Sequence, residues 1–420
     1  MPALTDSRQA TEQSTAQILR EIADRFATPC YAYDLRTLRI QADKLRAHLP
    51  AETELFYSLK ANASLGISET LAEYGLGADV ASAGELATAI RAGFAAERIF
   101  VAGPYKSPEA IAMLREHPAA IVSMDSPSEL EWLHSHGLVN QAVLRLRPDF
   151  DSTAVVVAGR DSRFGFLLDQ LSGLRRQIAA SNLPVIGFHI FAGSQVLRCE
   201  GVLGHFRAAR ALAERAAAAL EISPSFVNLG GGFGVPYGRD EPELELAPIG
   251  RELSAFCQRA PGIRFALELG RFLVAQAGWY LTSVVGHQTL RGQPAVVVDG
   301  GTHQRADLCG LCLKTKAAPP LALDCESTTL VPTEVLGCLS LPEDILAQSA
   351  LLPPLQVGDR LAFANAGAYG QWASAVNFHA FPAPTEVAFD GTSLKVMRRG
   401  RPAAAILDDQ LMLADQLDAT

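Results

Sequence analysis

Eight short β-rich runs alternate with helical patterns between residues 53 and 270, and this alternation limits the fold more than any other feature. The runs are TELFYSLK, GADVAS, RIFVAG, AAIVSMD, QAVLRLR, PVIGFHIF, SFVNLGG and RFALELG. The segments between them carry apolar residues three or four apart, with Ser, Pro or Gly near their ends. Strands joined through helices pair in parallel, so the pattern predicts an α/β fold. We expect a TIM-type (β/α)8 barrel over residues 35–280, with an open doubly wound sheet as the alternative.

The texture of the sequence changes after residue 280, where β-rich runs are broken by Gly, Pro and Asp turns. The runs are WYLTSVVGHQ, PAVVVDGG, RLAFANAGAY, PTEVAFD and SLKVMRRG. They predict a second, mainly β domain over residues 281–420. The early segment TPCYAYD resembles a further strand, so we expect residues 1–34 to complete that domain.

Composition narrows the classes of partner. The 420 residues carry a formal net charge of -9 without clusters of Lys and Arg, which argues against nucleic acid. No apolar stretch approaches the roughly 20 residues of a membrane span, and the first residues are polar. Seven irregularly spaced cysteines favour free thiols over a disulfide framework or a zinc site. We therefore expect a cytoplasmic protein that acts on small molecules and holds no metal.

Polar residues at the carboxyl ends of barrel strands form the active site in folds of this kind. Here the strand-end residues are Lys60, Asp79, Arg145, Arg147, His189, Phe191, Ser194, Gly230 to Gly234, Glu268, Gly270 and Arg271. Lys60 ends an apolar run, where an ammonium is costly to bury unless it is paired, acts as a base or forms an imine. Taken singly, each residue also has an ordinary structural interpretation. Their joint occurrence indicates a site.

The chemistry of this set points to pyridoxal phosphate. Bare glycine N–H groups with Ser194 and Arg271 nearby suit a phosphate dianion. Lys60 suits a Schiff base with an aldehyde, and a carboxylate at Glu268 suits a protonated pyridine nitrogen. Lys60 is therefore the expected imine-forming residue.

Seven ordered motifs over about residues 28–390 resemble the fold type III pyridoxal-phosphate decarboxylases, the family of diaminopimelate, ornithine and arginine decarboxylases. The motifs are FYSLKAN, GADVASAGEL, RIFVAGPYKS, GFHIFAGSQ, VNLGGGFG, ELGR and GAYG. The resemblance implies an alanine racemase-like barrel with a β domain, a homodimer with active sites at the subunit interface, and loss of an α-carboxylate as carbon dioxide.

The resemblance also implies roles for single residues. Lys60 would bind the cofactor and Glu268 would pair with its ring nitrogen. The phosphate would be held by Ser194, Gly231, Gly232, Gly270, Arg271 and Tyr369. Supporting positions around the lysine are Asp79, Glu85 and Arg145, with His189 and Phe191 on the sixth strand.

One departure from the family concerns proton delivery. The family carries a catalytic cysteine in a motif like GPLCT, whereas this chain has GCLSLPED. Aligned on Gly337 and Asp344, Ser340 takes the cysteine position and Cys338 that of the proline. A hydroxyl is a weaker acid than a thiol. A small register shift could bring Cys338 into the site instead, but in a strand adjacent residues face opposite sides and residues two apart share a side. We expect Ser340, ahead of Cys338, to face the site.

Further departures concern the substrate. Phe191 stands where a ring-stacking histidine is expected, and the arginine-proline pair that diaminopimelate decarboxylases use after DGG is missing. His303, Arg305 and His379 are the possible anion contacts in the altered segments. These changes favour larger substrates, such as citryl-diaminopropionate in siderophore biosynthesis or amino acids held on carriers. An amino-acid racemase on the same fold and an inactive regulatory homologue are the alternatives.

Overall fold

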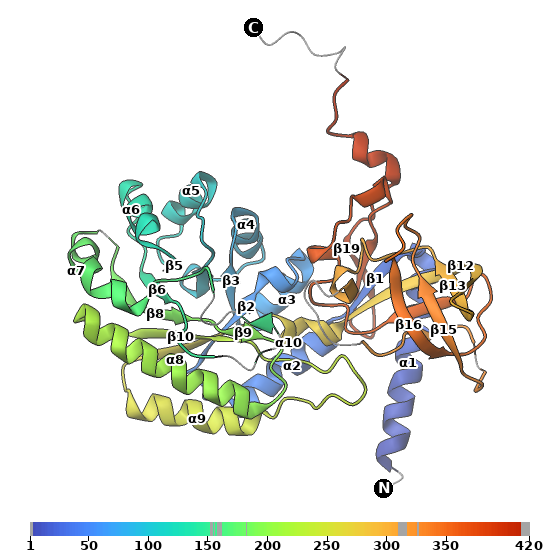
Figure 1. Cartoon of the computed structure of the whole chain (residues 1–420), viewed down its shortest axis with the longest axis horizontal. Coiled ribbons are helices and arrows are strands. Elements are labelled where there is room, and N and C mark those ends of the chain that lie inside the picture. Colours follow the sequence, from blue (N-terminus) through green and yellow to red (C-terminus); the bar gives the residue numbers. More distant parts are fainter. Residues whose placement is uncertain are drawn as a thin grey trace. The chain divides into compact units, whose positions relative to one another are not determined.

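The computed structural model describes residues 3–151, 154, 156–157, 162–181, 183–309, 317–325 and 327–412. The chain divides into two compact units (Figure 1). The barrel unit is Leu35–Gln276, and the β unit combines Met1–Asp34 with Ala277–Thr420. The sequence-based boundary at residue 280 falls inside strand β12 (Gly278–Leu290), at the third residue of the strand.

In the described part of the barrel unit, eight parallel strands close into a barrel, because β11 pairs with β2. The strands are β2 Glu54–Ser58, β3 Gly77–Val80, β4 Ile99–Val101, β5 Ile121–Met124, β6 Ala142–Leu146, β8 Val185–Ile190, β10 Phe226–Gly231 and β11 Arg264–Leu269. The predicted (β/α)8 barrel is thereby confirmed, and the open doubly wound sheet is excluded by closure. A short pair, β7 (Val156–Val157) with β9 (Gly193–Ser194), lies outside the barrel sheet.

Helices surround the barrel strands (Figure 1). They are α2 Leu35–His48, α3 Leu65–Glu73, α4 Ala83–Arg91, α5 Pro108–Glu116, α6 Pro127–Ser135, α7 Leu171–Ala180, α8 Cys199–Leu220, α9 Leu246–Arg259 and the short α10 Arg271–Val274. Ser82, Ser107 and Ser126 cap α4, α5 and α6, since each side chain accepts a hydrogen bond from the N–H three residues later. These caps fix where the helices begin after each strand.

Aromatic and aliphatic side chains fill the barrel interior. Phe56, Phe100 and Phe226 pack there with Ile121 and Val143, all buried. The Phe100 ring lies 5.8 Å from that of Phe56 and 6.1 Å from that of Phe226. Burial of each such side chain contributes about 1.5–3 kcal/mol. The filled interior leaves the ends of the strands as the place for chemistry.

The β unit is built on one sheet in which, among the described residues, nine strands pair. Strand β1 (Cys30–Asp34) lies between β12 and β18, and helix α1 (Ala3–Phe26) packs on the sheet through Leu19 and Ile22. The other strands are β12 Gly278–Leu290, β13 Gln293–Val298, β14 Leu321–Ala322, β15 Val331–Leu336, β16 Ile345–Leu352, β17 Arg360–Phe363, β18 Thr385–Phe389 and β19 Leu394–Arg398. The sequence patterns did not predict α1, β14, β15 or β16.

Among the described residues, no helix combines the length and the apolar character needed to cross a membrane.

Candidate active site

Charged side chains gather at the carboxyl end of the barrel strands. Asp79 lies on β3, Arg145 on β6, His189 on β8 and Glu268 on β11, and all four are buried or nearly so. Arg145 and His189 are register partners on neighbouring strands, and His189 is paired in turn with Asn228 on β10. The barrel thus brings residues from five segments of sequence to one end.

Lys60 lies just beyond a strand and not within it. Strand β2 ends at Ser58, and Lys60 occupies the 3-10 turn Leu59–Ala61, with 45% of its side chain exposed. The expectation of a buried ammonium at a strand end is corrected, because the turn lifts the residue to the rim. Its Nζ lies 4.0 Å from Asp79 Oδ2 and 5.1 Å from the centre of the Phe191 ring.

Asp79 is a buried carboxyl group beside that lysine. Ser58 Oγ donates a hydrogen bond of 2.7 Å to Asp79 Oδ2. Burial, and then the negative charge of Glu268, raise the pKa of Asp79 to about 7, although Lys60 and the Ser58 hydroxyl act against them. Near neutral pH this carboxyl group is therefore able to take up or release a proton.

The raised pKa gives a stability prediction for Asp79→Asn. The native state holds a proton between pH 3.8 and about 7 that the unfolded chain releases, so the wild type loses stability as pH rises through this range. The amide variant lacks this loss. We expect it to match the wild type near pH 4 and to exceed its unfolding free energy at pH 8 by about 2 kcal/mol or more.

Urea denaturation at pH 4, 6 and 8 measures the difference. Asp240→Asn, at an exposed aspartate of the same unit, is the control and should show no such trend. A constant difference between Asp79→Asn and wild type across the range would contradict a raised pKa.

Glu268 is the buried carboxylate of the site. Asn228 Nδ2 donates a hydrogen bond of 2.8 Å to Glu268 Oε1, and His189 Nε2 lies 3.1 Å from the same oxygen. Burial alone would raise the pKa of Glu268, but His189, Lys60 and Arg145 lower it to about 2. Glu268 is thus ionised over the whole physiological range.

His189 links this carboxylate to strand β5. Its Nδ1 lies 2.9 Å from Ser123 Oγ, and burial lowers the pKa of the ring against the opposing effect of Glu268. A neutral ring with its proton on Nε2 suits both neighbours, because Nδ1 can then accept from the Ser123 hydroxyl and Nε2 lies beside the carboxylate, although without the geometry of a hydrogen bond.

Asn228 was not singled out from the sequence, although the polar residue in the apolar run SFVNLGG was a signal. It is 0% exposed, and its Oδ1 accepts a hydrogen bond of 2.9 Å from the Gly230 N–H. Asn228 therefore ties Glu268 to the glycine run. We expect Asn228→Ala to weaken cofactor affinity about tenfold and to cost about 1–3 kcal/mol of stability, because a buried acceptor and donor lose their partner.

Equilibrium titration with pyridoxal phosphate and urea denaturation test the two effects. Asn140→Ala is the matched control. Asn140 is also buried, and its side chain donates to the carbonyl groups of His117 and Ala120, in the connection between α5 and β5. It should lose stability without losing cofactor affinity. Equal loss of affinity in both variants would show that Asn228 acts only through stability.

The glycine run ends β10 in a form that only glycine allows. A Cβ on Gly231 would lie 1.8 Å from the Glu268 carbonyl oxygen, and one on Gly232, which has φ +82°, would lie 2.3 Å from the Gly193 oxygen. The backbone is thus closely surrounded by neighbouring chain without side chains of its own. This close packing explains why glycine is required at both positions, and backbone N–H groups at such a turn are the donor type that binds phosphate oxygens.

Arg271 follows the next strand, β11, directly after Gly270. Its side chain is buried, and Nη1 donates a hydrogen bond of 2.9 Å to the Tyr237 hydroxyl group. Ser194 ends β9 and is partly buried. The guanidinium, the hydroxyl and the bare glycines are the donor types that bind phosphate, so this part of the barrel fits the cofactor expected from the sequence.

Glu85 and Arg145 have supporting contacts. Glu85 accepts a hydrogen bond of 2.7 Å from the Ala81 N–H and so fixes the turn into α4. Arg145 Nη1 lies 3.6 Å from Asp125 Oδ1, and its guanidinium lies over the Phe164 ring. Both residues hold the rim around Lys60 and Glu268 in place.

The structure corrects the strand argument for Ser340 and Cys338. The segment from Gly337 to Asp344 is the connection between β15 and β16, not a strand, so alternation of faces gives no preference there. Ser340 is exposed and Cys338 is partly buried. Burial, with Asp344 nearby, raises the pKa of the Cys338 thiol to about 12, so it is protonated at neutral pH.

The remaining predicted residues belong to the β unit. Arg305 is 1% exposed, and its Nε and Nη2 each donate a 2.8 Å hydrogen bond to Asp307, while its Nη1 has no hydrogen-bond partner among the described residues. Its contact with a substrate stays a prediction. His303 is buried, and burial lowers its pKa. His379 is exposed and, like Tyr369, has a left-handed backbone.

Comparison with known proteins agrees with this chemistry. A family model described as "Pyridoxal-dependent decarboxylase, pyridoxal binding domain" matches residues 35–275. The chain is 31% identical to the L-glutamyl-(BtrI acyl-carrier protein) decarboxylase of Niallia circulans, over 94% of this chain and 96% of the relative. It is 34% identical to the diaminopimelate decarboxylase of Actinosynnema pretiosum subsp. auranticum, over 90% and 88% of the two chains.

A third relative acts on another conjugate. The 2-((L-alanin-3-ylcarbamoyl)methyl)-2-hydroxybutanedioate decarboxylase of Staphylococcus aureus is 27% identical, over 84% of this chain and 92% of its own. Among solved structures, the diaminopimelate decarboxylase of Helicobacter pylori complexed with L-lysine superimposes with a TM-score of 0.84 at 25% identity, over 93% and 98% of the two chains.

Proposed function

Because the chain belongs to the family of pyridoxal-dependent decarboxylases, we propose that it removes the α-carboxylate of an amino acid whose far end is joined to a larger group. The enzyme is a pyridoxal-phosphate-dependent carboxy-lyase. Neither a racemase nor an inactive homologue occurs among the relatives described above. The observation that carries the chemistry is the meeting of Lys60, Glu268 and the glycine run at one end of the barrel.

Pyridoxal phosphate, when bound, accepts the electron pair that the departing carbon dioxide leaves behind. Lys60 is the amine proposed to hold its aldehyde carbon. Glu268, ionised at all physiological pH values, would keep the ring nitrogen protonated. The phosphate would be held by Ser194, Gly231, Gly232, Gly270 and Arg271. Asn228 and His189 fix the Glu268 carboxylate through the contacts described above.

Asp79 and Phe191, the two neighbours of Lys60, bear on proton transfer at the end of the barrel. The Asp79 carboxyl group, with its pKa near neutrality and 4.0 Å from Lys60 Nζ, is placed to exchange a proton with the lysine. Phe191 presents an apolar ring to Lys60 and offers no proton. Proton delivery on that side of the barrel would therefore depend on Lys60.

The substrate proposal rests on how the anion contacts are used. Free diaminopimelate carries a second α-amino acid group, and the carboxylate of that group needs a cationic partner. Arg305, a candidate for this contact, forms two hydrogen bonds to Asp307 within the β unit. An amino acid whose far end is joined to a carrier protein has no such need, as in the glutamyl group named for one relative. A second relative acts on an alanine joined to a citrate-derived acid, whose two carboxylates would need cationic partners other than Arg305.

Carbon dioxide release by the purified, cofactor-loaded enzyme tests the proposal. The panel contains glutamyl-carrier protein, citryl-diaminopropionate, meso-diaminopimelate, ornithine, lysine and arginine. We expect release from one of the two conjugates and little from the free amino acids. Fast release from diaminopimelate would overturn the substrate proposal and leave decarboxylation intact. Release from the citryl conjugate alone would assign the enzyme to siderophore biosynthesis.

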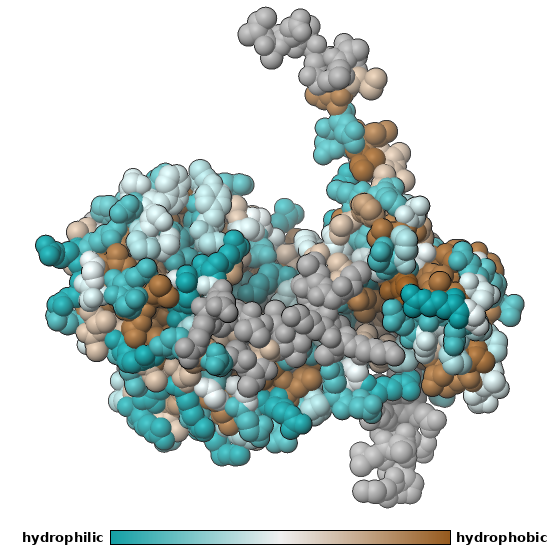
Figure 2. Space-filling model, viewed as in Figure 1, coloured by the Kyte–Doolittle hydropathy of each residue, from teal (hydrophilic) through white to brown (hydrophobic). Residues whose placement is uncertain are grey.

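We also propose that the enzyme is a cytoplasmic homodimer whose second subunit completes the site. Large exposed hydrophobic residues gather on the β unit in the region of β15 and β16 (Figure 2). They include Leu330, Leu341 and Leu351, each at least 40% exposed. Exposed apolar groups of this kind are typical of protein interfaces. Light scattering should give twice the chain mass, and free thiols such as Cys325 and Cys338 suit a reducing compartment.

A further inference from the structure

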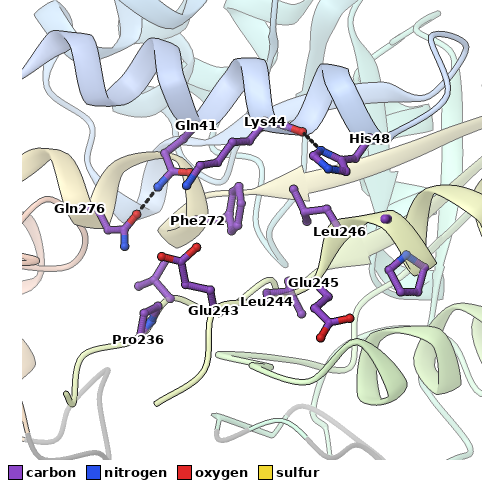
Figure 3. A pocket seen from close by; sticks show the side chains of 14 residues that line it. Gln41, Lys44, His48, Pro236, Glu243, Leu244, Glu245, Leu246, Phe272 and Gln276 are labelled. Carbon is purple, nitrogen blue, oxygen red and sulfur yellow. Dashed lines mark hydrogen bonds between the residues drawn. The ribbon is translucent and has the colours of Figure 1, made fainter. Parts of the chain in front are cut away.

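A cavity of about 410 Å³ lies in the barrel unit (Figure 3), and Lys60, Asp79 and Glu268 are not among the residues that line it. It is bounded by helix α2 on one side and by the segment that leads into α9 on the other, with α10 at its floor. The residues proposed to hold the phosphate do not line it, although Gly234, at the end of the glycine run, does. Its volume falls in the range of roughly 300–1,000 Å³ that is typical of small-molecule sites.

One end of the cavity is polar. Gln41 is 3% exposed, and its Nε2 donates a hydrogen bond to Gln276 Oε1, while its own Oε1 is buried without a hydrogen-bond partner among the described residues. A buried carbonyl oxygen without a donor is costly and attracts one. Figure 3 shows the Lys44 side chain running toward Gln41, and the Glu243 carboxylate pointing toward the Gln41–Gln276 pair.

The floor of the cavity is apolar. Val235, Leu246 and Phe272 line it, and each is less than a tenth exposed. Lys44 and Glu243 are exposed at the rim, and Glu245 and His48 also line the cavity. A ligand that fits must therefore carry opposite charges at one end and an apolar body at the other.

We propose that this cavity binds a free α-amino acid with an aliphatic side chain, separately from the reaction site. The ligand's carboxylate meets the Lys44 ammonium. Its ammonium donates to Glu243 and to the Oε1 of Gln41, which supplies the missing donor. Its side chain covers Phe272 and Leu246. Each group of the ligand thus has a partner of matching chemistry.

The cavity lies behind the loop that would hold the phosphate. Phe272 directly follows Arg271 in α10. Val235 exchanges two hydrogen bonds with the Gln195 side chain, at 2.6 and 3.2 Å, and Gln195 directly follows Ser194. A ligand that holds Val235 and Phe272 still would also hold Ser194 and Arg271. This coupling rests on the proposed cofactor residues, whereas binding in the cavity does not.

Calorimetric titration of the holoenzyme with L-norleucine tests binding. Lys44→Met and Gln41→Met should each weaken the affinity about tenfold, the effect of one lost charge-assisted contact. Arg91→Met removes a positive charge from the end of another barrel helix, α4, and should leave the affinity unchanged. Lys44 is exposed, so its variant keeps the test valid even if Gln41→Met folds poorly.

Two spectroscopic readouts separate this cavity from the reaction site. Binding in the cavity should leave the visible absorption of the cofactor unchanged and should slow its release into buffer about threefold, a modest coupling between sites. Failure to bind would overturn the proposal. So would binding that alters the cofactor spectrum and survives Lys44→Met, because that behaviour belongs to the reaction site. Both readouts test binding in the cavity alone. They would therefore be unchanged if the enzyme proved to act on a substrate other than the proposed conjugates.

Discussion

Lys60→Ala is expected to lose decarboxylation by about a thousandfold or more, because Lys60 is the amine that the described residues place beside Asp79 and Phe191, where the cofactor aldehyde would attach. Lys106, for comparison, is 1% exposed and bonds to Glu129. Reduction of the holoenzyme with borohydride followed by peptide mass spectrometry should place the cofactor on Lys60. Activity is measured as carbon dioxide release from the substrate found in the panel.

Lys60→Arg is the matched control for charge. It keeps a cation beside Asp79, and the guanidinium cannot form the imine, so its activity should fall as far as that of Lys60→Ala. Substantial activity in the arginine variant, or a cofactor label on Lys106, would refute the assignment of Lys60.

Glu268→Gln is expected to lower kcat about a hundredfold or more, since an amide cannot hold a proton on the ring nitrogen and the electron sink is weakened. The substitution is nearly isosteric, and Asn228 Nδ2 can still donate to the remaining oxygen. The loss should therefore appear in kcat, together with a loss of stability near neutral pH, because the lowered pKa of Glu268 means that its charge stabilises the native state there. A second readout is the absorption spectrum of the bound cofactor, which reports the protonation of its ring.

Glu54→Gln gives the control for Glu268→Gln. Glu54 begins β2 at the opposite end of the barrel and pairs with Arg264 at 2.9 Å. Its variant should keep kcat and the spectrum. If Glu268→Gln retains full kcat with an unchanged spectrum, the carboxylate does not face the ring nitrogen.

The barrel could be predicted because its signals are local. Each strand is a short apolar run and each helix has its own period and cap, so the order of elements is written along the chain. Glu268 was identified for the same reason, as a charged residue that ends an apolar run. The β unit gave weaker signals, and β15 was missed because VPTEVL mixes polar and apolar residues with a proline.

Other features depend on partners that sequence patterns do not reveal. Asn228 and Glu268 are forty positions apart, and only the closed barrel shows that one holds the other. The burial of Arg305 against Asp307 likewise needs the packed sheet around it. The exposure of Lys60 follows from a single turn after β2, which an apolar run followed by a lysine does not specify.

Strand β1 has a consequence for how the chain is assembled during synthesis. It leaves the ribosome before both of its sheet neighbours, β12 and β18, which follow the whole barrel unit in sequence. The barrel unit is continuous and can fold as soon as Gln276 has emerged. The sheet of the β unit must wait until β18 is made, because β1 can pair with β12 soon after the barrel but lacks its second neighbour until then. Strands β1 and β18, far apart in sequence, therefore pair late, and a stop codon before β18 should leave a folded barrel carrying an unfinished sheet.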